Sequence, residues 1–182
     1  MAICSLNRNL LRTTSCGYSL PEIVDIYLAN YADVTTETGQ TGDLEGCDSV
    51  SAITMESGAT FYHIEPRKNS TTFSDELVVE DNGTKYRTQT LGFGVAGTFD
   101  DCMHGSLDAL SLGKYLAIVK TAEGKYLALG RLTGLEAETA TLAGGGDSNN
   151  GIEVSLTANV TESALPLSEG AVATLLANIA DD

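Results

Sequence analysis

Apolar and polar residues alternate along much of this chain with the two-residue period that is typical of β-strands. The clearest region runs from Asp75 to Arg131, where two predicted hairpins flank one short amphipathic helix. The first hairpin turns at Asp81–Thr84 and the second at Ala122–Lys125. Each turn contains a glycine and lies between runs rich in β-branched, aromatic and aliphatic residues. We expect type I′ geometry at the first turn, because that geometry favours its Asp-Asn-Gly sequence. The pattern predicts a compact sheet module, and nothing in it resembles a reaction centre.

Further strands are predicted on both sides of this module. Their segments are rich in β-branched, aromatic and aliphatic residues: Glu22–Ala29, Ser49–Met55, Ala59–Glu65, Leu135–Leu142 and Ile152–Asn159. In the last of these, apolar residues alternate with Glu153, Ser155 and Thr157, which predicts one buried face and one solvated face. Thr35–Gly46 is polar, acidic and punctuated by glycines, so we expect a loop that is too long for a plain hairpin turn.

The strand that precedes the predicted helix has one face with almost no side chains. Leu91, Phe93 and Val95 point to one side, and the residues between and after them, Gly92, Gly94 and Ala96, point to the other. A strand face reduced to glycine and alanine lets another backbone or a helix approach closely.

Two helices are predicted. The first runs from Thr98, as its cap, to about residue 112 and ends at Gly113; its apolar stripe is Phe99, Cys102, Met103, Leu107 and Leu110. The second covers about residues 168–180, with Ser168 as its cap and an apolar stripe of Val172, Leu175, Leu176 and Ile179.

These elements predict a mainly β fold of the α+β kind. We expect an antiparallel β-sandwich or barrel with one flanking helix at about 98–112 and a C-terminal helix at about 168–180. The chain of 182 residues has no tandem repeat and no convincing boundary, so we expect a single domain over residues 21–182. Residues 1–20 are irregular and are predicted to form an N-terminal arm that docks on the body or on a neighbour.

Charge is the unusual property of the composition. The chain has 25 acidic and 10 basic residues, which gives a net charge of −15. Because the cations are scattered, this surface repels nucleic acid, and specific DNA or RNA binding is disfavoured. No apolar segment is long enough to span a bilayer, and the N-terminal residues do not have the pattern of a secretory signal. We therefore expect no membrane insertion, a reducing compartment, and free thiols at Cys4, Cys16, Cys47 and Cys102.

Several motifs were weighed as reaction or ligand sites. Gly92–Gly97 matches the dinucleotide-binding pattern G-x-G-x-x-G, but its glycines continue a strand, and no parallel βαβ unit follows. Asp147–Gly151 is similar to the start of a calcium loop, but Ala158 stands where the bidentate glutamate belongs.

Thiol and histidine chemistry is also disfavoured. Cys102 and His104 are two residues apart on the predicted helix and point in different directions, and Cys102 is expected on the apolar stripe. His63 has no sequence partner for a metal, and a chain with two histidines offers little for a zinc site or a catalytic triad. We assign no catalytic, cofactor-binding or metal-ligating residue, and we expect no enzyme and no cofactor.

The order of predicted elements resembles the tail tube proteins of long-tailed bacteriophages, of the type found in phages and prophages of Bacteroidota-like hosts. The likeness covers most of the chain from Glu22 to Leu167. The segments that carry it are EIVDIYLANYADV, YRTQTLGFGVAG, KYLAIVKTAEGKYLALGRLTGLEA and AGGGDSNNGIEVSLTANVTESALPL. The resemblance implies a structural virion protein that assembles into hexameric rings, and rings that stack into the tube through which DNA is ejected.

The resemblance also implies partners and a location. The partners would be copies of the chain itself and other tail proteins, namely sheath, tape measure and terminator, with DNA passing through unbound. The protein would be made in the host cytoplasm and end in the virion tail. Residues in the glycine-rich and acidic segments are then candidates for contacts between subunits: Thr35, Gly39, Gly42, Asp43, Gly46, Gly92, Gly94, Gly144, Asp147 and Asn150.

Two other classes of function stay open at this point. One is another ring-forming component of a tail, a connector or an injection machine. The other is a monomeric β-sandwich binding module, although the chain has no tryptophan, a residue that sugar-binding platforms often use.

Overall fold

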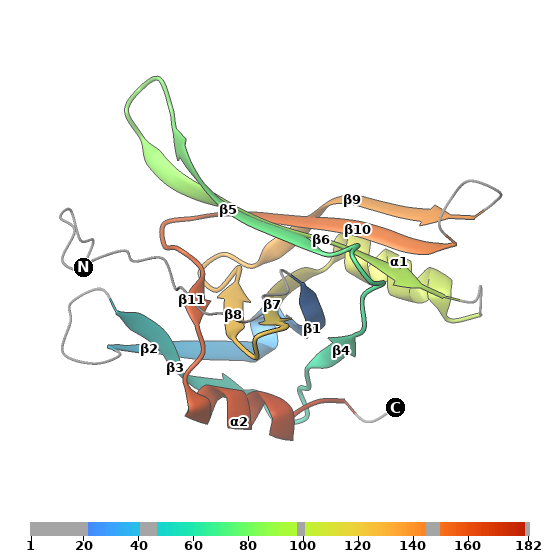
Figure 1. The fold of residues 1–182 in the computed structure, drawn as a ribbon, viewed down its shortest axis with the longest axis horizontal. Helices are drawn as coiled ribbons and strands as arrows, with labels where there is room; N and C mark the ends of the chain where they lie inside the picture. Colours follow the sequence, from blue (N-terminus) through green and yellow to red (C-terminus); the bar gives the residue numbers. More distant parts are fainter. Residues whose placement is uncertain (1–21, 41–46, 98–100, 145–149, 181–182) are drawn as a thin grey trace, which may run out of the picture.

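The computed structural model describes residues 22–40, 47–97, 101–144 and 150–180 (Figure 1). It confirms the predicted mainly β fold, an antiparallel β-sandwich with flanking helices. The strands are β1 (Ile23–Asn30), β2 (Val34–Gln40), β3 (Asp48–Met55), β4 (Tyr62–Ile64), β5 (Thr72–Val79), β6 (Lys85–Ala96), β7 (Lys114–Thr121), β8 (Tyr126–Leu129), β9 (Leu135–Ala143), β10 (Gly151–Val160) and β11 (Leu165–Pro166). The helices are a short 3₁₀ helix (Tyr31–Asp33), α1 (Met103–Leu112) and α2 (Glu169–Ala177). The predicted arm, residues 1–20, lies outside the described residues.

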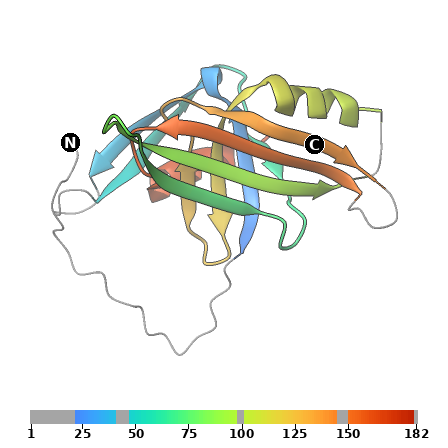
Figure 2. The same ribbon diagram turned by 90° about the horizontal axis from the view of Figure 1, so that it is seen from above.

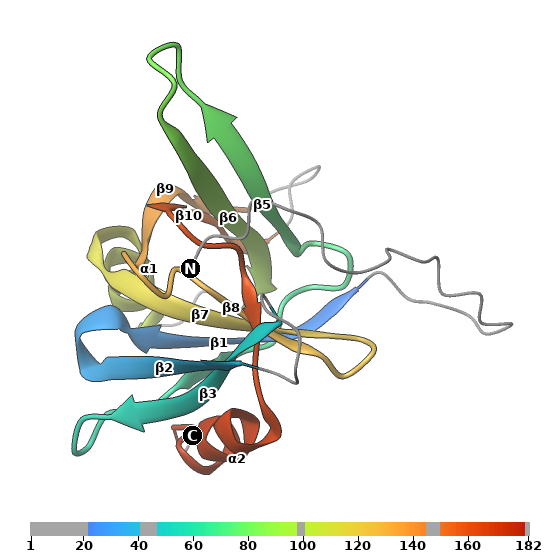
Figure 3. The same cartoon turned by 90° about the vertical axis from the view of Figure 1, so that its left-hand side faces the viewer.

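The strands form three layers (Figure 3). The first is the sheet β9-β10-β6-β5, in which every neighbouring pair is antiparallel. The second contains β4, β1, β7, β8 and β11, also paired antiparallel. Strand β7 joins these two layers, because Lys114 and Tyr115 pair with β9 while its later residues pair with β8. The third layer is the ribbon β2-β3 together with α2.

Two apolar cores lie on the two faces of the middle layer. Ile26, Leu28, Ala117 and Val119 face the first layer, while Tyr27, Ala29, Leu116 and Ile118 face the third. This explains the continuous apolar runs Ile26–Ala29 in β1 and Tyr115–Val119 in β7, since the side chains of these residues are buried on both faces. In contrast, the buried side chains of β10 are those of the alternate residues Ile152, Val154, Leu156, Ala158 and Val160, and this confirms its predicted alternation.

The predicted loop at Thr35–Gly46 is wrong over its first part. Residues Val34–Gln40 form β2, which pairs with β3 through a register shift between Glu37 and Thr38. The polar sequence lacks a two-residue apolar period, and the pairing with β3 decides its conformation. The predicted strand Ala59–Glu65 shortens to β4 and pairs with β1.

Both hairpins are confirmed, but the turn geometry differs from the type I′ prediction. In each hairpin a three-residue loop closes with the glycine at positive φ, +85° at Gly83 and +77° at Gly124. Asn82 does not have positive φ, as type I′ would require. The amide of Gly83 donates to the carbonyl of Glu80 at 2.8 Å, which is the pattern of a type I turn followed by a left-handed glycine.

The helices are confirmed with corrected ends and stripes. Helix α1 begins at Met103, and Cys102 precedes it as an exposed residue instead of lying on the buried stripe; Thr98 and Phe99 are outside the described residues. In α2, Ser168 caps the helix as predicted by accepting from the amide of Ala171 at 3.3 Å. Its buried residues are Ala171 and Leu175, while Leu176, predicted on the stripe, is 49% exposed.

Candidate assembly surface

The four strands β9-β10-β6-β5 form one sheet (Figure 2), and its outward face carries small hydroxyl side chains and carboxylates. The register sets this face, because the alternate positions Leu91, Phe93, Val154 and Leu156 are buried in the first core. Its central positions are Thr72, Ser74, Thr88, Thr90, Gly92, Gly94, Thr139, Thr141, Ser155 and Thr157, with Glu76 and Glu153 among them. The structure describes all residues of these four strands, and none of their outward positions is lysine or arginine. The outward positions of these four strands are therefore hydrophilic and acidic, while Arg67 and Lys68 lie beside them in the segment between β4 and β5.

A shallow hollow of about 560 Å³ lies on this face beside Gly92 and Gly94. The segment between β4 and β5 closes one end of it, where the amide of Arg67 donates to the carbonyl of Gly94 at 2.7 Å. A Cβ on Gly94 would lie 3.4 Å from Cβ of Ser70. These contacts are with the amide of Arg67 and the side chain of Ser70, so the approach of another backbone or a helix to the bare face stays a prediction.

Strand β5 ends the first layer, and among the described residues it pairs with β6 alone. The amide of Glu80 donates to the carbonyl of Thr84 at 2.9 Å, which directs the backbone of Glu80 toward β6. Antiparallel pairing alternates, so the backbone groups of Phe73, Leu77 and Val79 point to the open edge. This edge can accept another strand.

The hairpin β5-β6 projects beyond the other layers (Figure 3), and it carries apolar side chains that are exposed among the described residues. Phe73, Leu77 and Val79 lie on the side of β5 that continues the core face, and they are 38%, 59% and 56% exposed. Leu77 and Val79 are two residues apart and form a strip on this edge strand, while Asp75 separates them from Phe73. Such a strip marks a contact surface in a stable soluble protein.

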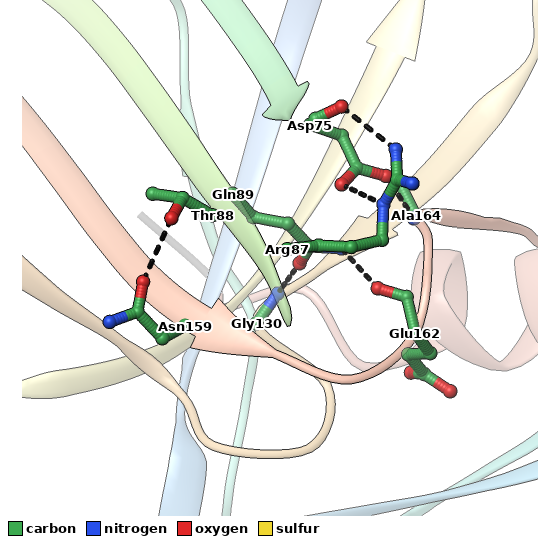
Figure 4. A network of polar contacts seen from close by, with 8 residues as sticks. All are labelled: Asp75, Arg87, Thr88, Gln89, Gly130, Asn159, Glu162 and Ala164. Carbon is green, nitrogen blue, oxygen red and sulfur yellow. Dashed lines mark hydrogen bonds and ion pairs between the residues drawn. The ribbon is translucent and has the colours of Figure 1, made fainter. Parts of the chain in front are cut away.

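A polar network fixes the base of this hairpin (Figure 4). Gln89 of β6 is 2% exposed, and its Oε1 accepts from the amide of Gly130 at 2.8 Å. Its Nε2 donates to the carbonyl of Glu162 at 3.4 Å. One buried side chain thereby links β6 to the turn after β8 and to the segment after β10.

Two arginine–carboxylate pairs complete the network. Arg87 Nε donates to Asp75 Oδ1 at 2.7 Å, and Asp75 Oδ2 accepts from the amide of Ala164 at 2.8 Å. Arg131 contacts both carboxylate oxygens of Glu162, with 2.6 Å between Nε and Oε1. Both pairs are partly buried: the carboxylate of Asp75 is shared between Arg87 and Ala164, and Arg131 binds Glu162 through both carboxylate oxygens. The bond from Asp75 to Ala164 ties the hairpin to the segment after β10 and so holds it at a fixed angle to the body.

A second polar cluster joins β1, β4 and β7. Asp25 accepts from Lys120 Nζ at 2.7 Å and contacts His63 Nε2 at 3.0 Å, while the His63 ring stacks on Tyr27 with centroids 5.0 Å apart. Burial acts to raise the pKa of Asp25, but the hydrogen bonds from Lys120 and His63 outweigh it, so this pKa lies below its ordinary value of 3.8. The hydrogen bond to Asp25 raises the pKa of Lys120. The cluster lies on three paired strands and stabilises their registration.

Replacing Asp25 with asparagine tests this cluster through pH. Because the folded-state pKa of Asp25 is lowered, its charged form stabilises the fold above pH 3.8, and this contribution is lost as the pH falls through the lowered pKa. We expect Asp25→Asn to cost about 1 kcal/mol at pH 7 and progressively less below pH 4, measured by urea unfolding. Glu56→Gln, at an exposed turn, should change little at either pH. A cost for Asp25→Asn that stays constant down to pH 2 would contradict the assignment.

The described subunit-contact candidates fall into two groups, one in the first layer and one in the third. Gly92 and Gly94 lie on the outward face of β6, Gly144 and Asn150 lie at the ends of β9 and β10, and Thr35 and Gly39 lie on β2 in the third layer. The remaining candidates, Gly42, Asp43, Gly46 and Asp147, are outside the described residues. The strip on β5 and the anchor at Gln89 were not predicted, although a glutamine at an inward position of an alternating strand was a usable signal.

The glycine motif of β6 and the Cys102–His104 pair do not form a ligand or reaction site in the structure. Gly92 and Gly94 lie inside β6; Gly92 pairs with both β10 and β5, and Gly94 pairs with β10, so the strand interpretation of the G-x-G-x-x-G match is confirmed. Cys102 and His104 are exposed at the start of α1. Within the described ranges no group of three histidine, cysteine or acidic side chains could hold a metal ion. No helix in the described part of the chain is long and apolar enough to cross a membrane.

Comparisons with protein-family models, curated proteins and solved structures found no match for this chain. The features of the molecule that bear on its function are therefore the sheet β9-β10-β6-β5, its open edge, its apolar strip and its hydrophilic face.

Proposed function

We propose that this protein is a structural virion protein whose copies assemble into hexameric rings, and that stacked rings form the tail tube of a long-tailed phage. The observation that carries the proposal is the four-stranded layer β9-β10-β6-β5, which ends in a strand whose outer edge has no partner among the described residues and which carries an exposed apolar strip. The resemblance of the sequence to tail tube proteins supports the same function. The proposed location is the virion tail, with synthesis in the host cytoplasm.

The two margins of this layer are complementary. All its pairs are antiparallel, so β6 and β9 run in one direction and β10 and β5 in the other. Joining β5 of one copy to β9 of the next therefore continues the antiparallel order. From Ala137 to Ala143, β9 pairs with β10 and has no second strand partner among the described residues. A head-to-tail contact between two different margins closes into a ring when the rotation per copy divides a full turn.

The size of such a ring suits a conduit for DNA. With strands about 4.8 Å apart and tilted by about 40°, six copies of the layer would give a barrel roughly 48 Å across between backbones. Side chains on the inner face would narrow the channel by roughly 10 Å, and it would still be wider than the DNA duplex. The sheet face opposite the cores would line this channel.

The chemistry of that face favours passage without binding. Hydroxyl groups and carboxylates on β9-β10-β6-β5 offer a wettable wall with no cationic side chain at its outward positions. Phosphates are repelled by carboxylates and bound chiefly by lysine and arginine. DNA would therefore slide through without sticking.

A change of charge on this face tests its position in the assembly. Thr90 and Thr157 are cross-strand neighbours on the outward face. We expect assembled Thr90→Lys/Thr157→Lys protein to retain duplex DNA at least tenfold more than the unmodified assembly at low salt. The control Ala173→Lys/Ala177→Lys adds the same charge on exposed positions of α2, in the opposite layer. Equal retention by both variants would contradict a channel lined by this sheet.

Light scattering with negative-stain microscopy of the purified protein tests assembly itself. The proposal expects hollow cylinders of stacked rings. Single rings that do not stack would favour a connector or another ring-forming tail component. A monomer that persists at high concentration would contradict self-assembly and favour a monomeric β-sandwich binding module.

A further inference from the structure

Two apolar surfaces at opposite margins of the first layer have no cover among the described residues. One is the strip on β5, with Leu77 59% and Val79 56% exposed. The other is Leu112, the last residue of α1, which is 87% exposed. Helix α1 lies along the β9 margin of the layer, and β5 forms the other margin (Figure 2).

One side of helix α1 packs against the first core, and the opposite side is exposed among the described residues. Met103, Leu107 and Leu110 pack against the first core. Asp108 and Leu112 are four residues apart, so they share one side of the helix, and both are exposed. That side combines a carboxylate with a large apolar side chain.

The β5-β6 hairpin presents the matching pair. Lys85 lies directly opposite Val79 in the register, so it shares the face that carries Leu77 and Val79, and it is exposed. This face therefore combines an ammonium group with an apolar strip. Charge and apolar character are complementary between the hairpin and the free side of α1.

Geometry brings these two surfaces together in the proposed ring. Ala137 of β9 and Leu91 of β6 both pair with Leu156 of β10, so they lie at the same height along the strands. Leu77 of β5 pairs with Arg87 of β6, which is four residues closer to the hairpin tip than Leu91. In a barrel with strands tilted by about 40°, each four-stranded copy is offset from the next by about five residues along the strands. An offset of that size toward the tip places Leu77 and Val79 beside the start of β9 in the neighbouring copy. Because Lys114 pairs with Glu136 there, the end of α1 with Leu112 lies at the same level.

We infer that the apolar side of the β5-β6 hairpin docks on α1 of the adjacent copy, with Leu77 and Val79 against Leu112 and with Lys85 beside Asp108. This contact rests on the proposed function and specifies the surfaces that join two subunits. It buries the strip on β5 and the exposed end of α1 in one interface.

Two single charge reversals and their mixture test the contact. Asp108→Lys and Lys85→Asp should each raise the concentration needed for assembly by roughly fivefold to tenfold, because each places like charges at every subunit contact. Mixed in equal amounts, the two variants should assemble within about twofold of the unmodified protein. In an alternating ring, each helix with the altered residue 108 then meets a hairpin with the altered residue 85, and every other contact is unmodified.

Glu56→Lys and Lys125→Asp provide the matched control, since both reverse an exposed charge in a turn away from this contact. They should assemble like the unmodified protein, alone or mixed, and circular dichroism should show all variants folded. Single variants that assemble normally, or a mixture that assembles no better than its components, would overturn this contact while leaving the proposed tube intact. Failure of the unmodified protein to assemble would overturn both.

Discussion

Replacing Leu77 with proline is expected to leave a folded protein that no longer assembles. The backbone of Leu77 points away from β6, as set by the hydrogen bond from Glu80 to Thr84. Proline at this position removes an amide that the hairpin does not use and that an added strand needs. We expect the assembled fraction, measured by sedimentation, to fall at least tenfold. The free energy of unfolding should change by about 1 kcal/mol or less.

Two matched variants separate pairing at the edge from the loss of an apolar side chain. Leu77→Thr keeps the amide and introduces a β-branched side chain that suits a strand, so assembly should weaken but persist. Glu76→Pro removes an amide that points toward β6, so it should destabilise the hairpin itself. Normal assembly of Leu77→Pro would show that β5 is not a pairing edge.

Replacing Gln89 with leucine is expected to be strongly destabilising although the volume is nearly kept. Gln89 is 2% exposed and satisfies the buried amide of Gly130 and the carbonyl of Glu162. Leucine would leave both groups without a partner, at a cost of about 2–3 kcal/mol in the free energy of unfolding. Urea unfolding at neutral pH measures this loss.

The adjacent residue supplies the control for Gln89. Thr88 donates to Asn159 Oδ1 at 2.9 Å on the outward, solvated face of the same strand (Figure 4). Thr88→Val should cost about 0.5 kcal/mol or less, because water can replace the lost partner. Equal costs at the two positions would contradict the role of Gln89 as the buried anchor of the hairpin.

The elements that local chemistry specifies were predicted correctly. Gly83 and Gly124 fix both hairpins, and the apolar runs of β1 and β7 identify strands buried on two faces. Strand β2 was missed because its threonines and glutamate carry no apolar period, and only its pairing with β3 makes it a strand.

Errors at the helices have a related cause. In α2 the buried position near β3 is taken by Ala171, whereas the larger Leu176 is half exposed. Size and periodicity alone did not reveal which face of a short helix packs. Cys102 was placed on the stripe of α1 by the same reasoning and lies just before the helix, exposed.

The polar clusters and the exposed strip depend on contacts between segments that are distant in sequence. Asp25 meets His63 and Lys120 across 38 and 95 residues of sequence, and no local pattern links them. The bare face of β6 was predicted from Gly92 and Gly94, because a period of two is visible locally. The exposed strip on β5 was not, because its residues read as an ordinary half-buried strand until the hairpin is seen to project beyond the layers below it.

A cryo-electron microscopy reconstruction of the assembled protein tests the central claim most directly, since it shows which strands lie side by side between copies. We expect one uninterrupted wall of strands around a hollow axis, in which the terminal strand β5 borders β9 of the adjacent subunit. An assembly in which β5 faces solvent, or in which subunits meet only through the third layer, would contradict it.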